Sequence, residues 1–145
     1  MYLNTSNVEK EIRTLEVSKY VSTVAAVHEV RVKLVEEQQQ MGKNKGIVMD
    51  GRDIGTVVFP NAELKIFMNS SSHTRAQRRY EELIEKGDSV TFEEVLQNVE
   101  ERDYMDTHRH DSPLRKSEDA IEIDNSLLSR EEQFEKVLAL VKKIR

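Results

Sequence analysis

The 145-residue sequence contains no cysteine and has only two prolines and five glycines. Without cysteine the chain forms no disulfide and offers no thiolate to a metal ion, which favours a reducing compartment. No apolar run approaches the roughly 20 residues that a membrane-spanning helix needs. The first residues also lack the basic-then-apolar pattern of a secretion signal. We therefore expect a cytoplasmic protein with no membrane segment.

The chain has fewer basic than acidic residues. It contains 22 Lys and Arg and 27 Asp and Glu, which give a formal net charge of -5. This balance argues against broad nucleic-acid binding, although local basic clusters are compatible with it. Hydrophobic residues make up 37% and charged residues 34%, so the length suits a single charge-rich domain with a real core.

The scarce glycines do not form a phosphate-binding loop. Gly46-x-x-x-x-Gly51-Arg52-Asp53 imitates the spacing of the Walker A motif, but its interior reads as an apolar strand. Asp53 also stands where the motif needs a metal-binding hydroxyl. Gly42-Lys43 fails because an asparagine follows it. The sequence therefore gives no sign of the loop that cradles nucleotide phosphates.

Helical and strand-like segments alternate along most of the chain. Capping-box spacing at Ser6, Thr91 and Ser129 predicts three helix starts. Apolar periodicity predicts helices over 7–20, 23–41, 70–87, 91–104 and from 129 onward, and short strands over 47–50, 63–69 and 120–124. Alternation of this kind predicts an α/β fold with a parallel sheet flanked by helices. Three strands make a thin sheet, and the two opening helices precede any strand.

The most informative run is residues 46–60, where a short apolar strand ends at Asp50-Gly51 and is followed at once by Arg52 and Asp53. Ligands of open parallel sheets bind beyond the carboxyl ends of the strands. An arginine offers a bidentate fork to phosphate, and an aspartate accepts from amino or hydroxyl groups. The alternative is a tight turn with a local Asp–Arg ion pair.

Two further arginine groups lie at helical spacing. Arg75, Arg78 and Arg79 share one helix face and would repel one another unless a polyanion binds there. The alternative is a solvated face on which they pair with Glu81, Glu82 and Glu85. Arg102, Asp106 and Arg109 also stack on one face if their helix continues, which suits a sugar phosphate. The alternative there is a row of intrahelical ion pairs.

The histidines give no clear site. His108-x-His110 has a spacing that could chelate a metal ion, but the sequence suggests no third ligand, and an exposed polar loop is the better interpretation. No Ser-His-Asp or Cys-His arrangement is recognisable. We predict no metal site.

Several motifs occur in order over nearly the whole chain, and together they resemble the bacterial cytidylate kinases, nucleoside monophosphate kinases that act on CMP and dCMP. The strongest is Asp50-Gly51-Arg52-Asp53-Ile54-Gly55-Thr56-Val57-Val58-Phe59-Pro60. The others are Val8 to Thr14, Tyr20-Val21-Ser22, Val30-Arg31, Lys65-Ile66-Phe67, Arg75-x-x-Arg78-Arg79, Glu101-Arg102-Asp103-x-x-Asp106-x-x-Arg109 and Ile123-Asp124.

The resemblance implies a role for each matching residue. Ser22, Arg31 and Asp53 match contacts to the cytosine base, Arg52 and Arg109 match contacts to the CMP phosphate, and Arg102 and Asp106 match contacts to the sugar hydroxyls. Arg75, Arg78 and Arg79 lie in the part that matches the lid over ATP, and with Arg109 they are the expected catalytic group. ATP with Mg²⁺ would be the co-substrate.

The resemblance also implies a division of the chain. Residues 1–45 match part of the CMP-binding insert, and residues 46–145 match the C-terminal part of a P-loop NTPase-type core with a lid at about 70–110. The family's phosphate loop and central strand have no counterpart in this sequence. We therefore expect phosphoryl transfer from ATP to CMP for the family, with little or no activity from this chain alone. The alternatives are a CMP-binding fragment without catalysis, or a fragment that self-associates through exposed sheet edges.

Overall fold

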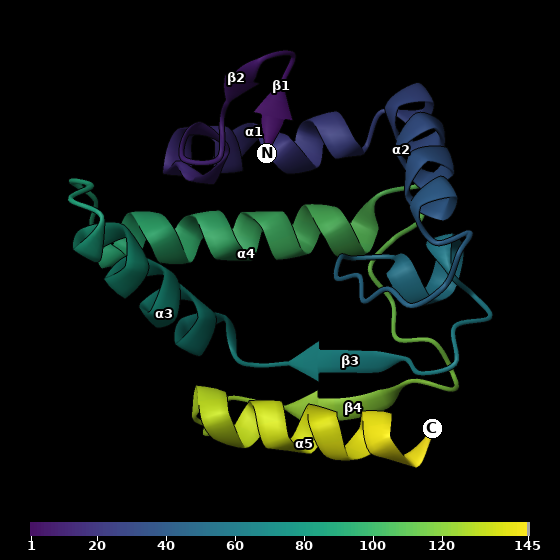
Figure 1. Ribbon diagram of the computed structural model, residues 1–145. Helices are drawn as coiled ribbons and strands as arrows, with labels where there is room; N and C mark the ends of the chain where they lie inside the picture. Colours follow the sequence, from purple (N-terminus) through teal and green to yellow (C-terminus); the bar gives the residue numbers. More distant parts are fainter. Residues whose placement is uncertain (145) are drawn as a thin grey trace.

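The fold was examined in a computed structural model that describes residues 1–144. Figure 1 shows α4 in the middle of the molecule, with α1 on one side and the strand pair β3–β4 on the other. The helices are α1 (Leu15–Ala25), α2 (His28–Met41), α3 (Ser72–Glu85), α4 (Phe92–His108) and α5 (Arg130–Lys143), with a 3₁₀ turn η1 (Glu11–Arg13) and a π-helical turn η2 (Ile54–Val58). The strands are β1 (Tyr2–Leu3), β2 (Ser6–Asn7), β3 (Ile66–Asn69) and β4 (Ile121–Asp124).

The parallel sheet consists of two strands, β3 and β4, in a register that runs from Ile66 opposite Ile121 to Asn69 opposite Asp124. Lys65 precedes β3 and reaches across to Asp119, with its Nζ 2.7 Å from the carboxylate. This ion pair ties together the starts of both strands. The α/β class and the parallel pairing predicted from the sequence are confirmed, as are the two strands near 63–69 and 120–124.

The predicted strand over 47–50 is wrong. These residues run without regular structure, and Val48 is fully exposed. A strand needs a neighbour for its backbone N–H and C=O groups, and no other described segment pairs with this one. The apolar run therefore has strand-forming residues but no partner.

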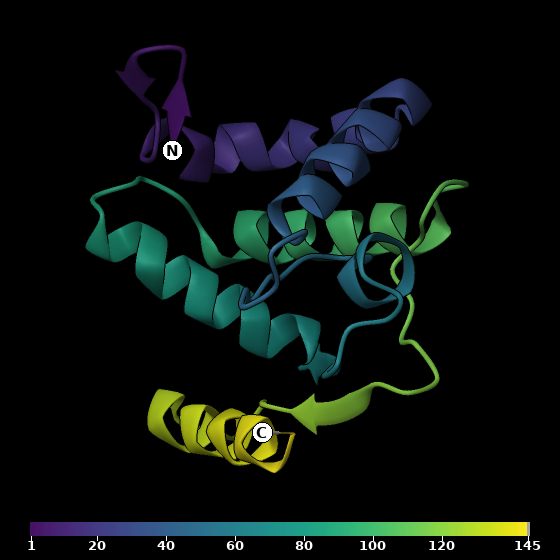
Figure 2. The same ribbon diagram turned by 45° about the vertical axis from the view of Figure 1, so that its right-hand side comes forward.

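The predicted helices over 7–20 and 23–41 have the wrong boundaries. Ser6 begins no helix, because it lies in β2 of a small hairpin whose turn places Asn4 at a φ of 54°. The cap of α1 is Thr14, whose hydroxyl accepts from the N–H of Val17. The second predicted helix is divided at residues 26–27 between α1 and α2, which Figure 2 shows at a marked angle to each other.

The predicted helix starts at 91 and 129 are confirmed. Thr91 and Ser129 each form a complete capping box, with Glu94 and Glu132 respectively. Ser71 caps α3 through the N–H of Thr74. Helix α4 continues to His108, so of the exposed loop predicted at His108-x-His110 only Arg109 and His110 lie outside the helix.

The core lies between α3 and α4. Ala76, Leu83 and Val95 are completely or almost completely buried there, and Tyr80 and Phe92 pack beside them with ring centroids 6.2 Å apart. Burial of apolar side chains is the dominant favourable contribution to folding, so this cluster holds α3 against α4. The core therefore fixes the position of helix α4, which carries Arg102 and Asp106.

Candidate functional site

Asp53 is the first residue that the fold places in a chemically significant position. It lies just before η2 and is 4% exposed, although it carries a charge. Its Oδ2 accepts from Nη1 of Arg31 at 2.6 Å, and Nε of Arg31 donates to the carbonyl of Ala25 at the end of α1. Arg31 therefore connects α1, α2 and the run after residue 50.

The ion pairs continue from Asp53 into α4 and back again. Nη2 of Arg109 lies 3.9 Å from Asp53, and its Nη1 lies 3.6 Å from Asp106. Nε of Arg52 then donates to Asp106 at 2.9 Å. We call this alternating row, Arg31–Asp53–Arg109–Asp106–Arg52, the Arg–Asp ladder. The Arg109–Asp106 pair is of the intrahelical kind that one alternative predicts, at the end of α4, whereas Asp53 and Arg52 pair with residues of other segments.

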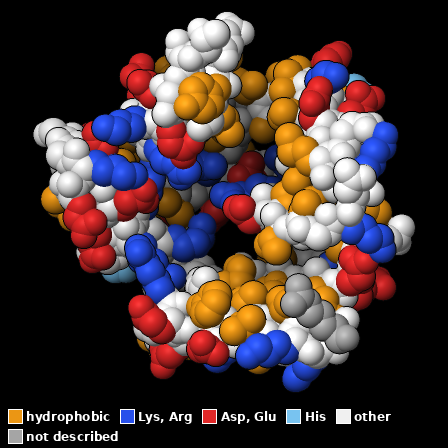
Figure 3. Space-filling model, viewed as in Figure 1, with side chains coloured by type: hydrophobic (Ala, Val, Ile, Leu, Met, Phe, Trp, Pro, Cys, Tyr) orange, Lys and Arg blue, Asp and Glu red, His pale blue; other side chains and the backbone are white. Residues whose placement is uncertain are grey.

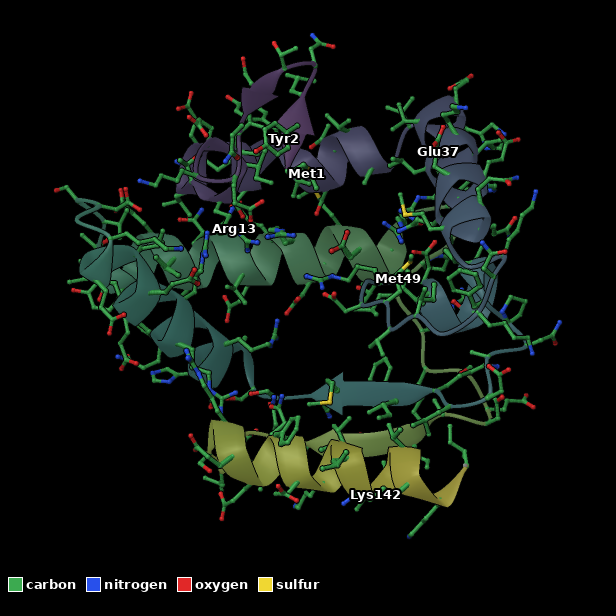
Figure 4. All side chains as sticks on the ribbon, viewed as in Figure 1. Met1, Tyr2, Arg13, Glu37, Met49 and Lys142 are labelled. Carbon is green, nitrogen blue, oxygen red and sulfur yellow. The ribbon has the colours of Figure 1, made fainter. Side chains whose placement is uncertain are left out.

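The charges of the ladder do not cancel. Three guanidinium groups face two carboxylates, and Arg102 adds a further positive charge near Arg52. Figure 3 shows Lys, Arg, Asp and Glu side chains gathered around a hollow between α4 and the strands. In Figure 4, Met49, which precedes the ladder residues of this run, lies beside the end of α4. The surplus of positive charge suits an anionic ligand.

Two buried polar atoms at the site have no hydrogen-bond partner among residues 1–144. They are Oγ of Ser22, a residue that is 3% exposed, and Nε of Arg102. An unmade hydrogen bond on a buried group costs about 1–3 kcal/mol, so such atoms are unusual in a folded protein. A polar ligand that reaches them would remove this cost.

Burial changes the acidity of two arginines at the site. It lowers the pKa of Arg102, and the nearby Arg52 lowers it further. Burial is also the main cause that lowers the pKa of Arg109, ahead of repulsion from Arg31. Both groups remain charged near neutral pH, but each would gain from an additional negative charge.

The three arginines of α3 do not converge on one point. Arg75 makes a bidentate ion pair with Asp103 of α4, at 2.9 and 2.6 Å. Arg78 donates to the carbonyl of Asn125 after β4 at 2.7 Å. Arg79 pairs with Glu82 and also donates to the carbonyl of Arg13, which Figure 4 labels above α4. Pairing with Glu81 and Glu85, which the sequence left open, is not among these contacts.

The sequence reasoning missed Ser18, Asn98 and Asp103. Ser18 lies one turn before Ser22 in α1, and Asn98 lies one turn before Arg102 in α4. A search of these helices at intervals of four residues would have found both. Asp103 belongs to the motif around Arg102, but no local signal in the sequence indicates its contact with Arg75.

Within residues 1–144 no group of three or more His, Asp or Glu side chains could hold a metal ion. His110 and His28 instead contact opposite oxygens of Asp111, at 2.9 and 2.8 Å. No described helix is both long and apolar enough to cross a membrane.

The family model described as "Cytidylate kinase" matches residues 1–143. The chain belongs to the cytidylate kinase family. It is 72% identical over 144 residues to a cytidylate kinase of Flavobacterium psychrophilum, a match that covers 99% of this chain and 64% of that relative. It is 59% identical over 134 residues to a cytidylate kinase of Bacteroides thetaiotaomicron, which covers 92% of this chain and 58% of the relative.

The chain thus spans about 60% of the length of the curated relatives that it matches. Cytidylate kinases are nucleoside monophosphate kinases, a family of phosphotransferases. The complete Arg–Asp ladder falls within the matched residues.

Proposed function

We propose that this chain supplies the CMP-binding part of a cytidylate kinase, which transfers a phosphoryl group from ATP to CMP or dCMP. The observation that carries the proposal is the Arg–Asp ladder together with the unpaired Oγ of Ser22 and Nε of Arg102. The family assignment supports this reaction, and the surplus positive charge of the largely buried ladder supports a site for the acceptor nucleotide.

The cytosine base would lie against Ser22, Arg31 and Asp53. Ser22 has a free hydroxyl, and Asp53 and Arg31 hold each other at 2.6 Å. Cytosine offers an amino donor and carbonyl and ring-nitrogen acceptors, and these groups complement a carboxylate, a guanidinium and a hydroxyl. A wrong base would leave one of these buried groups unpaired, which discriminates strongly.

The sugar and phosphate would lie along α4. Arg52 and Arg109 would hold the phosphate, and Arg102 and Asp106 would hold the sugar hydroxyls. Arg109 and Asp106 are each 4% exposed as side chains, so they are held in place before any ligand enters. Residues 1–45 would form part of the CMP-binding insert, and residues 46–145 the C-terminal core.

The lid at about 70–110 would bring Arg75, Arg78 and Arg79 toward the phosphates of ATP. Arg78 donates to a backbone carbonyl, and Arg79 donates to a carbonyl and to the half-buried Glu82, all partners that a phosphate could replace. An arginine that reaches the group in transfer can be worth about 10³–10⁵ in rate. Among residues 1–144 no group of three or more His, Asp or Glu side chains could hold Mg²⁺, and the ion would enter bound to the phosphates of ATP.

Calorimetry with CMP and AMP tests the acceptor site. CMP should bind with a clear preference over AMP, and Asp53→Ala should remove that preference. Equal affinity for the two nucleotides, or unchanged binding by the variant, would contradict the base site.

A second candidate, self-association, is favoured by the open edge of the sheet. Strand β3 pairs only with β4 among the described residues, and exposed apolar side chains lie nearby, with Met68 40% and Phe134 61% exposed. Figure 3 shows hydrophobic side chains gathered below the hollow, in the region of the strands and α5. An unpaired edge of this kind accepts a strand from another chain. Light scattering should show a mass that rises with concentration, and a constant monomer mass would exclude this candidate.

A further inference from the structure

Two buried hydrogen bonds connect Asn98, Ser18 and Arg102, none of which belongs to the Arg–Asp ladder. Oγ of Ser18 donates to Oδ1 of Asn98 at 2.8 Å, and Nη1 of Arg102 donates to the same Oγ at 2.9 Å. Ser18 is 9% exposed and Asn98 7% exposed. Polar side chains this deeply buried between α1 and α4 need a reason beyond solubility.

The direction of these bonds follows from the chemistry of the groups. A guanidinium only donates, so the serine oxygen must accept from Arg102. The single hydroxyl proton then needs another acceptor, and Oδ1 of Asn98 provides it. Asn98 therefore orients the hydroxyl, and the hydroxyl orients the guanidinium.

Arg102 has few other contacts that could hold it. Among residues 1–144 its Nε is buried without a hydrogen-bond partner, and repulsion from Arg52 and Arg79 opposes the attraction of Asp106 and Asp103. No carboxylate lies within ion-pair distance of its guanidinium among residues 1–144. A long side chain in this situation keeps a fixed orientation only if a neighbour holds it.

The spacing places this row beside the site. Asn98, Arg102 and Asp106 occupy successive turns of α4, and Ser18 and Ser22 occupy successive turns of α1. Arg102 thus lies between Ser18, which supports it, and Asp106, the nearest member of the Arg–Asp ladder in α4.

From this geometry we infer that Ser18 and Asn98 are positioning residues, which hold the guanidinium of Arg102 in the orientation that meets the sugar of CMP. The inference rests on the proposed function for the role of Arg102, but the restraint on its side chain is independent of that role. Removal of either polar group should release Arg102 without changing the base contacts of Arg31 and Asp53.

Nuclear magnetic resonance of the arginine side chains tests the restraint without any ligand. The Arg102 guanidinium should rotate slowly in the unchanged chain and rapidly in Ser18→Ala and Asn98→Leu. Ser18→Thr keeps a hydroxyl and Asn98→Asp keeps an acceptor, so both should retain slow rotation. Thr23→Ala, an exposed change in the same helix, is the matched control. Identical Arg102 signals in Ser18→Ala and the control would overturn the inference, whether or not CMP binds.

Calorimetry then separates positioning from simple helix packing. Ser18→Ala should weaken CMP binding about tenfold while leaving the preference for CMP over AMP unchanged. In an Arg102→Ala background the same change should have no further effect, because its action passes through Arg102. An equal loss in both backgrounds would overturn the positioning role. A complete lack of CMP binding by the unchanged chain would instead count against the proposed function, and the resonance experiment would still decide on the restraint.

Discussion

Arg31 and Asp53 are 22 residues apart in the sequence, yet Nη1 of one lies 2.6 Å from Oδ2 of the other. The pair is almost fully buried, at 11% and 4% side-chain exposure. It fixes α2 against the run that follows residue 50, and so it joins the two parts into which the resemblance divides the chain. Its loss should therefore affect both stability and base recognition.

We predict that Arg31→Gln lowers the free energy of unfolding by about 3 kcal/mol, because it leaves a buried carboxylate with weaker partners. Urea denaturation followed by circular dichroism measures this change. Lys33→Gln breaks an exposed ion pair with Glu37 in the same helix and is the matched control. Because this pair is exposed to solvent, the change should lower the free energy of unfolding far less than Arg31→Gln does. Equal losses in the two variants would show that the buried pair has no special importance.

Leu83 should be the most sensitive position of the α3–α4 core, since it is completely buried. Leu83→Ala removes apolar contacts and leaves a cavity, which should cost about 3 kcal/mol. The neighbouring Ile84 is 45% exposed, so Ile84→Ala should cost clearly less. Thermal unfolding of both variants measures the two losses of stability. A larger loss for Ile84→Ala than for Leu83→Ala would show that the core does not lie at Leu83.

The His28–Asp111 pair should make stability depend on pH. A hydrogen bond to Asp111 raises the pKa of His28 above 6.5, and the same contact lowers the pKa of Asp111 below 3.8. The histidine contribution is fully present below pH 6.5 and disappears as the pH rises through the raised value. The aspartate contribution is present above pH 3.8 and disappears as the pH falls through the lowered value.

His28→Asn should therefore lower the melting temperature at pH 5 to 6 and have little effect at pH 9. Melting curves of both chains across this range test the prediction. The difference should vanish in an Asp111→Asn background. A melting-temperature difference that stays constant with pH would mean that the ion pair does not contribute.

Kinase activity should be very low for the 145-residue chain alone, because its sequence contains no phosphate-binding loop. We expect CDP formation from ATP and CMP to appear when the part of the Flavobacterium psychrophilum relative outside the match is joined to this chain. A coupled assay for ADP measures both proteins. The joined protein with Arg109→Ala is the control and should lose most of its activity. Robust activity of the chain alone would refute the expectation.

Local signals predicted the second half of the fold well. The capping boxes at Thr91 and Ser129 satisfy backbone N–H groups with side chains a few residues away, so the sequence contains the whole interaction. The box at Ser6 has the same spacing but fails, because residues 2–7 pair as a hairpin instead. The strand expected at 47–50 fails for another reason, since a strand depends on a neighbour that no local pattern reveals.

Some candidate site residues were predicted from residue chemistry and others only from the family resemblance. The adjacency of Arg52 and Asp53 at the end of an apolar run pointed to a ligand from residue chemistry alone. Ser22 and Arg31 entered only through the family resemblance, because nothing local links them to Asp53. The contact of Arg75 with Asp103 was not expected, since it depends on how closely α3 and α4 pack.

The Arg–Asp ladder has a consequence for the speed of binding. Each of its carboxylates lies between two guanidinium groups, so the ion pairs themselves hold these side chains in place. Preorganisation of this kind spares an arriving molecule the entropic cost of ordering the side chains. A nucleotide would exchange one set of partners for another, and its encounter rate would follow the surplus positive charge and fall steeply with added salt.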